Sequence, residues 1–259
     1  VFSKFMGEAV VDEILNRGKV SLVFGANVSC HIEGLIDYFR CVIRLIGREG
    51  VFVFEDPYFV DIVEQTSYDQ IYDEHVWYFT ITFINNILAR FGYHVFDCEH
   101  IPVHGGELRM YVGHKDKFKQ KSIVDDWLKK ETDLEGKLDE LQKNVKTSKT
   151  QLLDILHRVK KDRKRICGFG ATSKGVTVAN YCGIGPDLVP FITDNTPVKI
   201  GKYYPGVHIP IVPQDKFRDV DYAFLFAWNH FKEIDESQVW FRASGGKWIT
   251  HVPSPRIIA

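Results

Sequence analysis

The fold is most clearly indicated by residues 165–175, which have the sequence RICGFGATSKG. Residues 166–169 form a short apolar run typical of a buried strand, and the glycines after it lead into a predicted helix over residues 174–181. A strand, a glycine turn and a helix in this order build parallel sheets covered by helices. Backbone amides at such a helix start also suit a phosphate, and Gly168 and Gly170 permit its close approach.

The alternation continues to the end of the chain and predicts a doubly wound sheet over residues 165–259. Apolar runs typical of strands recur at residues 188–193, 221–227 and 247–252. A helix is predicted between the last two of these runs, over residues 230–241.

The first part of the chain shows a similar alternation and ends differently. Helical and strand-like patterns take turns, at residues 2–15, 19–26, 32–46 and 51–55. After a predicted helix over residues 78–91 come two β-rich runs, 93–101 and 107–112, separated by His104-Gly105-Gly106. Because glycines permit a tight reversal, we expect these runs to form an antiparallel hairpin that closes a partial α/β sheet.

A charged segment separates the two α/β parts. Residues 115–164 alternate in charge and carry widely spaced apolar residues, without a clean heptad over several repeats. This pattern favours a helical connector of one or two exposed helices with one packed face over a sustained coiled coil. The predicted organisation is therefore a first domain at 1–114, a connector at 115–164 and a second domain at 165–259.

Composition excludes several classes of protein. A formal net charge of −1 over 259 residues argues against a nucleic-acid-binding surface. No apolar run approaches the roughly 20 residues of a membrane span, and the start lacks a signal-peptide pattern, so a cytoplasmic protein without membrane contact is expected. The five cysteines are widely scattered and include no Cys-x-x-Cys pair. They therefore predict neither a disulfide framework nor a metal site.

The candidate active site is the stretch DQIYDEH at residues 69–75. It places the phenol of Tyr72, the carboxylate of Glu74 and the imidazole of His75 between two apolar runs. Ionisable groups are costly to bury without partners, so this stretch is predicted to present them to a ligand. His75 suits proton transfer because the pKa of histidine lies near the working pH.

Several other polar residues allow two interpretations each. Asp194 follows Gly170 at the distance of the ribose-binding acid in dinucleotide folds, which makes a nicotinamide enzyme a rival, although the third glycine departs from that fingerprint. The loop 199–210 is either a phosphate- or base-binding loop or a solvated surface loop. Trp228-Asn229 is either a pair that stacks on and hydrogen-bonds a base, or a strand end followed by a helix cap.

A series of motifs, taken together and in order, resembles a known family. The family is the sugar C-methyltransferases that use S-adenosylmethionine and act on nucleotide-linked keto-deoxysugars. The resemblance covers nearly the whole chain, and its motifs are Glu55-Asp56-Pro57-Tyr58, Asp69-x-Ile71-Tyr72-x-Glu74-His75, His104-Gly105-Gly106-x-Leu108-Arg109, Gly168-x-Gly170-Ala171-x-x-Lys174-Gly175, Ile192-Thr193-Asp194-Asn195-Thr196-Pro197 with Lys199-x-Gly201-Lys202, and Ala227-Trp228-Asn229.

The resemblance implies a fold for both parts of the chain. Residues 1–114 would be the later half of a class I, Rossmann-like methyltransferase sheet with its terminal antiparallel hairpin, and residues 165–259 a second Rossmann-like domain. The family's N-terminal zinc-binding cysteines and its early glycine-rich turn have no counterpart in this sequence. Asp73 stands where family members usually carry histidine.

The resemblance also implies a reaction. Its acceptor is a 4-keto-6-deoxy sugar on a nucleoside diphosphate, commonly thymidine diphosphate, whose enolate attacks the methyl group of S-adenosylmethionine. His75 is the expected base, with Tyr72 as hydrogen-bonding partner or alternative base and Glu74 holding the imidazole or a sugar hydroxyl. His31, otherwise a capping or packing residue, is expected to polarise the ketone. Ala26 and Asn27 are the expected cofactor-binding residues.

Further residues are assigned to the acceptor by the same motifs. The expected substrate-binding residues are Arg109, Gly170, Ala171, Lys174, Lys199, Lys202, Tyr203, Tyr204 and Asn229. Two alternatives stay open at this point: a nucleotide-sugar-binding fragment without a complete cofactor site, and a nicotinamide-dependent oxidoreductase. The sequence does not predict the oligomeric state.

Overall fold

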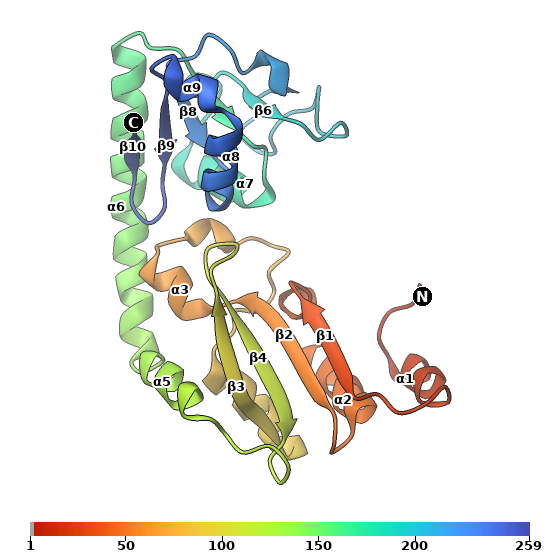
Figure 1. Ribbon diagram of the computed structural model, residues 1–259. Helices are drawn as coiled ribbons and strands as arrows, with labels where there is room; N and C mark the ends of the chain where they lie inside the picture. Colours follow the sequence, from red (N-terminus) through yellow and green to blue (C-terminus); the bar gives the residue numbers. More distant parts are fainter. Residues whose placement is uncertain (1–2) are drawn as a thin grey trace. The chain divides into compact units, whose positions relative to one another are not determined.

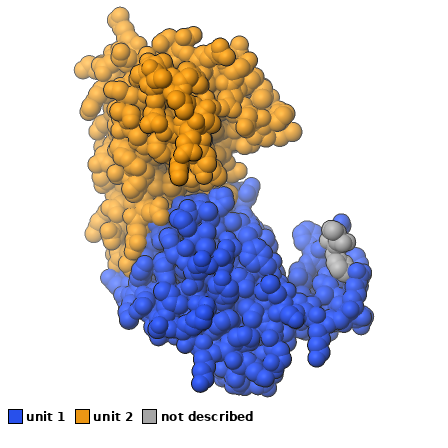
Figure 2. Space-filling model, viewed as in Figure 1, with its two compact units in different colours: residues 1–61, 73–135 blue, residues 62–72, 136–259 orange. Residues whose placement is uncertain are grey.

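The computed structural model describes residues 3–259 and divides the chain into two compact units. Unit 1 comprises residues 1–61 and 73–135, and unit 2 comprises residues 62–72 and 136–259 (Figure 2). The segment 62–72 thus belongs to the second unit although it interrupts the first. No helix among residues 3–259 is both long and apolar enough to cross a bilayer.

Unit 1 contains a mixed four-stranded sheet in the order β1-β2-β4-β3 (Figure 1). The strands β1 and β2 run parallel, and β4 pairs antiparallel with both β2 and β3. The predicted hairpin is confirmed, and its turn places His104, Gly105 and Gly106 at positive φ, where glycine is favoured. The strands are β1 (Leu22–Ala26), β2 (Val51–Pro57), β3 (Tyr93–Ile101) and β4 (Glu107–His114).

Helices bury the apolar face of this sheet. Phe39 of α2 contacts Phe52 and Phe54 of β2, and Phe79, just before α4, packs edge-on against Phe54. All four rings are almost fully buried, so this aromatic cluster forms much of the core of unit 1. The helices are α1 (Glu8–Leu15), α2 (Leu35–Ile46), α3 (Phe59–Glu64), α4 (Ile81–Leu88) and α5 (Ser122–Lys130), with short 3-10 helices η1 (Ser29–His31) and η3 (Ala89–Phe91).

Unit 2 contains a six-stranded sheet in the order β10-β9-β8-β5-β6-β7. All neighbouring strands are parallel except β10 and β9. The first strand, β5, lies inside the sheet; the chain continues to one side through β6 and β7, then to the other from β8. The strands are β5 (Ile166–Phe169), β6 (Ile192–Asp194), β7 (Ile211–Pro213), β8 (Tyr222–Leu225), β9 (Lys247–Thr250) and β10 (Arg256–Ile258).

The predicted connector forms two helices, the short α5 and the long α6 (Leu134–Lys161). The long helix has the expected packed face. Leu152, Leu156 and Val159 are buried in the main core of unit 2, so this part of α6 is a structural layer of that unit and not only a connector. The remaining helices are η2 (Tyr68–Gln70), α7 (Ser173–Cys182), η4 (Gln214–Lys216), η5 (Trp228–His230), α8 (Phe231–Ser237) and α9 (Val239–Ala243).

The α/β prediction is confirmed in both units, and the differences concern short elements. The helix predicted over residues 230–241 is broken into α8 and α9, and the strand predicted from residue 188 begins only at Ile192. Leu188 and Val189 are buried without belonging to a strand, so their apolar run reflects packing. The strands β7 and β10 were not predicted because three residues are too few to show a period.

Candidate functional site

Two histidines of the sequence prediction meet in unit 1. His31, at the end of η1, lies with its ring centroid 5.0 Å from that of His75. The Nδ1 atom of His31 lies 2.6 Å from the carbonyl oxygen of Glu74. His75 is 6% exposed, whereas His31 is open to solvent. The pair therefore combines an enclosed imidazole with one that a ligand can reach.

Main-chain hydrogen bonds hold the two histidines together. The carbonyl oxygen of Cys30 accepts from the N–H groups of Val76 (2.8 Å) and Trp77 (3.2 Å). The indole N–H of Trp77 also donates to the carbonyl oxygen of Ile32 at 2.7 Å. The chain after His75 is thus fixed to the turn that carries His31, which limits the motion of both rings.

Sequence reasoning did not place Cys30 and Asp56 beside this pair. Asp56, at the end of β2, is fully buried and accepts the N–H of Cys30 at 3.2 Å. Burial raises the pKa of Asp56, although its hydrogen bonds with Cys30 oppose that effect. Asp56 belonged to a recognised motif, but no local pattern showed that it would lie beside Cys30.

Glu74 contacts the histidine pair through its main chain, and the predicted role of its side chain stays a prediction. Its side chain is exposed, and the interaction that it makes with a catalytic candidate is through its main-chain carbonyl to His31. Tyr72 ends the segment that belongs to unit 2, and its role as partner of His75 stays a prediction.

The predicted cofactor residues lie at the carboxyl end of β1. Ala26 ends this edge strand with an exposed side chain. Asn27 follows at a φ of 53° and donates its N–H to the carbonyl oxygen of Glu55 at 2.8 Å. The carboxyl end of a parallel strand is where α/β sheets bind ligands, so the position fits a cofactor.

Arg109 is engaged by two carboxylates within unit 1. Its guanidinium lies 2.8 Å from Glu55 and 2.8 Å from Glu99, which ties β4 to both of its neighbouring strands. The hydrogen bond with Glu55 is the main cause that raises the pKa of Arg109. Both carboxylates compete with a substrate for the guanidinium of Arg109, and substrate binding by Arg109 stays a prediction.

The first half of the 69–75 stretch forms a buried polar cluster in unit 2. Asp69 and His251 are both fully buried, with Nε2 of His251 3.6 Å from Oδ2 of Asp69. The same oxygen accepts the indole N–H of Trp228 at 2.6 Å. Next to this cluster, Nζ of Lys174 donates to Oε1 of Gln70 at 3.2 Å. Asp69 is therefore an internal anchor and not a group presented to solvent.

Acid is expected to destabilise unit 2 through Asp69. Burial alone would raise the pKa of Asp69, but attraction by His251 and hydrogen bonding by Trp228 hold it below its usual range. The ionised carboxylate thus adds stability above the unfolded pKa of about 3.9, and this contribution is lost as pH falls through the lower folded value. Asp69→Asn should flatten the decline in unfolding free energy between about pH 5 and pH 2, measured by urea unfolding.

The matched control for this pH profile is Asp154→Asn, since Asp154 is an exposed carboxylate on α6 of the same unit. The unfolding free energy of Asp154→Asn should decline with acid as that of the wild type does. An Asp69→Asn profile parallel to that of the wild type would contradict a stabilising role for ionised Asp69.

The glycine turn of unit 2 opens a cavity of about 450 Å³ at the carboxyl ends of β5, β6 and β8. Gly170 has a φ of 80°, and a Cβ atom there would lie 2.8 Å from that of Ala227, so glycine allows the close approach. Thr172 caps α7 by accepting the N–H of Gly175 at 3.1 Å. Residues lining the cavity include Phe169, Gly170, Thr172, Asp194, Asn195, Thr196, Ala227 and His230.

Asp194 organises this turn through hydrogen bonds of its own. Its two oxygens accept the N–H groups of Ala171 (2.8 Å) and Thr196 (2.7 Å), and Nζ of Lys199 lies 3.6 Å away. Burial opposes these contacts, yet they hold the pKa of Asp194 below its usual range. Lys199 also donates to the carbonyl oxygen of Ala171 at 2.8 Å, which joins the 199–210 loop to the turn.

The other predicted substrate residues differ in accessibility. Lys202 and Tyr203 are exposed, and Lys174 and Asn229 are half-buried. Tyr204 is 1% exposed and its hydroxyl donates to the carbonyl oxygen of Thr172, so it packs in the core of unit 2 and does not face a ligand. In the sequence, a tyrosine beside lysines in a loop resembles a binding residue. Its burial could not be predicted, because it depends on packing against Phe226, which lies far away in the chain.

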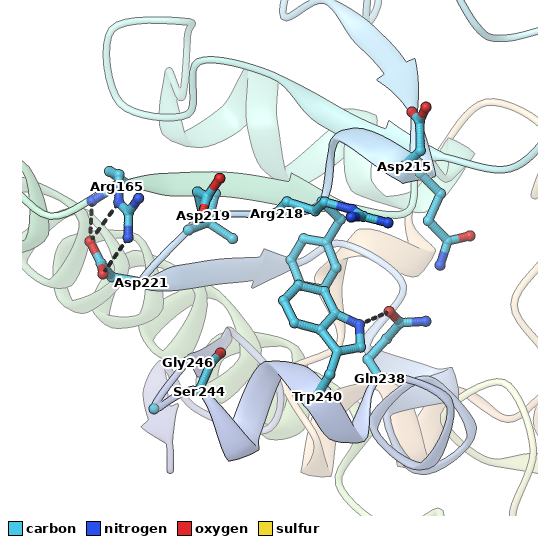
Figure 3. Close-up of a pocket in the computed structure, with 13 residues that line it drawn as sticks. Arg165, Asp215, Arg218, Asp219, Asp221, Gln238, Trp240, Ser244 and Gly246 are labelled. Atoms are coloured by element: carbon cyan, nitrogen blue, oxygen red, sulfur yellow. Dashed lines mark hydrogen bonds and ion pairs between the residues drawn. The ribbon is translucent and has the colours of Figure 1, made fainter.

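Unit 2 has a further cavity, of about 800 Å³, that lies elsewhere (Figure 3). It opens at the amino ends of β5, β8 and β9, whereas parallel sheets bind ligands at their carboxyl ends. Figure 3 shows that Arg165 there is paired with Asp221 and that the indole of Trp240 donates to Gln238. None of the predicted site residues lines it, so size alone does not make it the candidate site.

Comparisons with known proteins agree with the ordered motifs. A family described as "C-methyltransferase C-terminal domain" matches residues 102–253. C-methyltransferase NovU of Streptomyces niveus is 30% identical over 258 residues, which cover 96% of this chain and 61% of NovU. The crystal structure of M1.HpyAVI is 14% identical, with a TM-score of 0.28 over 44% of this chain and 55% of that one, a likeness too low to assign a fold. The family match covers more than half of the chain, which therefore belongs to the C-methyltransferase family, as its motifs predicted.

Proposed function

We propose that this chain takes part in C-methylation of a nucleotide-linked 4-keto-6-deoxy sugar, with S-adenosylmethionine as methyl donor. The observation that carries the proposal is the pair formed by His75 and His31, whose ring centroids lie 5.0 Å apart in unit 1. One imidazole can take a proton while the other stabilises the negative charge that results.

His75 would act as the base. In its neutral form, one ring nitrogen holds a lone pair that can remove a proton from the carbon beside the ketone. The carbon–hydrogen bond breaks, its electron pair forms the enolate, and the proton stays on His75. Low exposure of His75 keeps water from competing for that nitrogen.

His31 would stabilise the enolate oxygen. Its Nδ1 atom lies 2.6 Å from the carbonyl oxygen of Glu74, which can only accept, so Nδ1 carries the hydrogen of that bond. Donation to the enolate oxygen then comes from Nε2 and requires the imidazolium form, in which both ring nitrogens carry a hydrogen. The ring is thereby oriented, and its exposure lets it meet the ketone. When bound, S-adenosylmethionine supplies the electrophilic methyl group; Ala26 and Asn27, at the carboxyl end of β1, are the residues that would contact it.

Unit 2 would hold the nucleoside diphosphate. Its sheet has the strand order of dinucleotide-binding folds, and the cavity of about 450 Å³ lies at the carboxyl ends of its central strands. The amides at the start of α7 and the side chain of Lys174, which donates to Gln70 in this structure, would supply hydrogen-bond donors for a diphosphate. A ribose-binding role for Asp194 is less favoured, because both of its oxygens already accept backbone N–H groups.

Lys174→Met is expected to weaken binding of thymidine diphosphate by about 10–100-fold, since a hydrogen bond to a charged group contributes roughly 1.5–3 kcal/mol. Isothermal titration calorimetry measures the change. Lys216→Met removes the same charge from an exposed position on η4 and should bind like the wild type. Equal affinities in the Lys174→Met and wild-type chains would contradict the assignment of Lys174.

Titration with S-adenosylhomocysteine and with a nicotinamide dinucleotide separates the alternatives. Binding of thymidine diphosphate and S-adenosylhomocysteine supports the methyltransferase. Binding of thymidine diphosphate alone supports a chain that holds only the acceptor. Binding of the dinucleotide, seen as a change in its fluorescence, would favour the oxidoreductase.

A further inference from the structure

The two histidines are accompanied by a thiol. The Sγ atom of Cys30 and one ring nitrogen each of His31 and His75 all lie within 4.8 Å of one another. Cys30 is 1% exposed and His75 is 6% exposed, while His31 faces solvent and leaves a path for entry. These three side chains form what we call the Cys-His-His cluster.

The donor atoms of the Cys-His-His cluster suit a borderline-soft cation. Thiolate sulfur and imidazole nitrogen are the ligands that Zn²⁺ prefers, at about 2.3 and 2.0–2.1 Å. Around a tetrahedral ion, such ligands lie roughly 3.4–3.8 Å apart. A small rotation of side chains that are at most 4.8 Å apart would therefore bring them to the required spacing.

The orientation of His31 is a second observation that favours a metal. Histidine ligands in metal sites usually donate their other ring N–H to a carbonyl or carboxylate, which fixes the tautomer. The contact of 2.6 Å between Nδ1 of His31 and the carbonyl oxygen of Glu74 has this geometry. It leaves Nε2 of His31 as the nitrogen with a lone pair.

The charge around Cys30 also favours a cation. Asp56 is fully buried and accepts the N–H of Cys30. A divalent ion would replace the thiol proton and be attracted by Asp56 from outside the ligand shell.

We propose that Cys30, His31 and His75 bind a divalent cation of the zinc type, with the fourth position left to water. The Cys30 thiol loses its proton to solvent, and each histidine donates the lone pair of one nitrogen. The bound ion occupies the lone pair of His75. Metal binding and proton removal by His75 therefore exclude each other, a consequence that rests on the proposed function.

The test is a titration of the reduced, metal-free chain with Co²⁺, which reports a thiolate ligand through a sulfur-to-cobalt charge-transfer band. One equivalent should produce the band, and Zn²⁺ should remove it by displacement. Cys30→Ser should abolish the band. His31→Gln should weaken binding by about 100-fold or more, because even residues outside the ligand shell alter affinity 10–100-fold.

Cys41→Ser provides the matched control, since Cys41 is also a buried thiol of unit 1 and should leave the band unchanged. His31→Gln alters an exposed ring and keeps the test valid if Cys30→Ser fails to fold. No band in the wild type, or a band that either Cys30→Ser or His31→Gln leaves at wild-type affinity, would overturn the site. If Co²⁺ produces the band and the cobalt-loaded chain still exchanges the proton beside the ketone of the acceptor, the metal site stands and the role of His75 as base is contradicted.

Discussion

Replacing His75 with alanine is expected to slow proton removal from the acceptor by about 10²–10⁴-fold, the range that a positioned general base contributes. The structure gives His75 the features of such a base, since it is nearly buried and lies beside His31. Binding of thymidine diphosphate should not change, because His75 belongs to unit 1 and the proposed diphosphate site to unit 2.

The measurement is deuterium uptake into a thymidine-linked 4-keto-6-deoxy sugar in D₂O, followed by mass spectrometry. Exchange at the carbon beside the ketone needs the base and not the methyl donor, so it reports the first step alone. His94→Ala is the control, because His94 lies on β3 of the same unit and contacts the carbonyl oxygen of Phe118. Exchange at the wild-type rate in His75→Ala would remove His75 from the mechanism.

His251→Ala is expected to lower the free energy of unfolding of unit 2 by about 3–5 kcal/mol. Truncating a fully buried ring to alanine leaves a cavity, which has a cost of this size, and it also removes the imidazole that lies beside the buried Asp69 carboxylate. Asp69 is fully buried and would keep the hydrogen bond from Trp228, but it would lose the imidazole of His251, whose Nε2 lies 3.6 Å from its carboxylate. Urea unfolding at neutral pH measures the change.

A double-mutant cycle separates charge from packing. If the stranded Asp69 carboxylate causes the loss, adding Asp69→Asn to His251→Ala should recover part of it, since the amide carries no charge. His157→Ala changes an exposed histidine on α6 and should alter stability by less than about 0.5 kcal/mol. Additive effects of Asp69→Asn and His251→Ala would show that the two side chains are not coupled.

The α/β architecture could be predicted because its signals are local. Apolar runs of strand length, helical spacing and glycine turns each depend on a few neighbouring residues. The hairpin of β3 and β4 was predicted from two β-rich runs and the glycines between them, and the start of α7 from the turn at Gly170. Elements of three residues, such as β7 and β10, carry too little pattern to be found this way.

The composition of the site could be predicted only in part. His31 and His75 were both chosen from the sequence, and the structure brings them together. Tyr204 was chosen as well, yet it is buried against Phe226, because loop composition does not reveal which side chain turns inward. The scattered cysteines, Cys30 among them, predicted no metal site, since the distance of Cys30 from His75 in the sequence hides the cluster that the fold creates.

The sequence by itself determined the alternation of the longer strands and helices, the glycine turn before α7, and the family to which the chain belongs. Only the tertiary structure decided which polar groups meet. His31 contacts a carbonyl 43 residues away, and Asp69 is held by Trp228 from a distance of 159 residues. The physical reason is range: backbone propensities act between near neighbours, whereas the burial and pairing of polar side chains depend on which surfaces come together when the sheets pack.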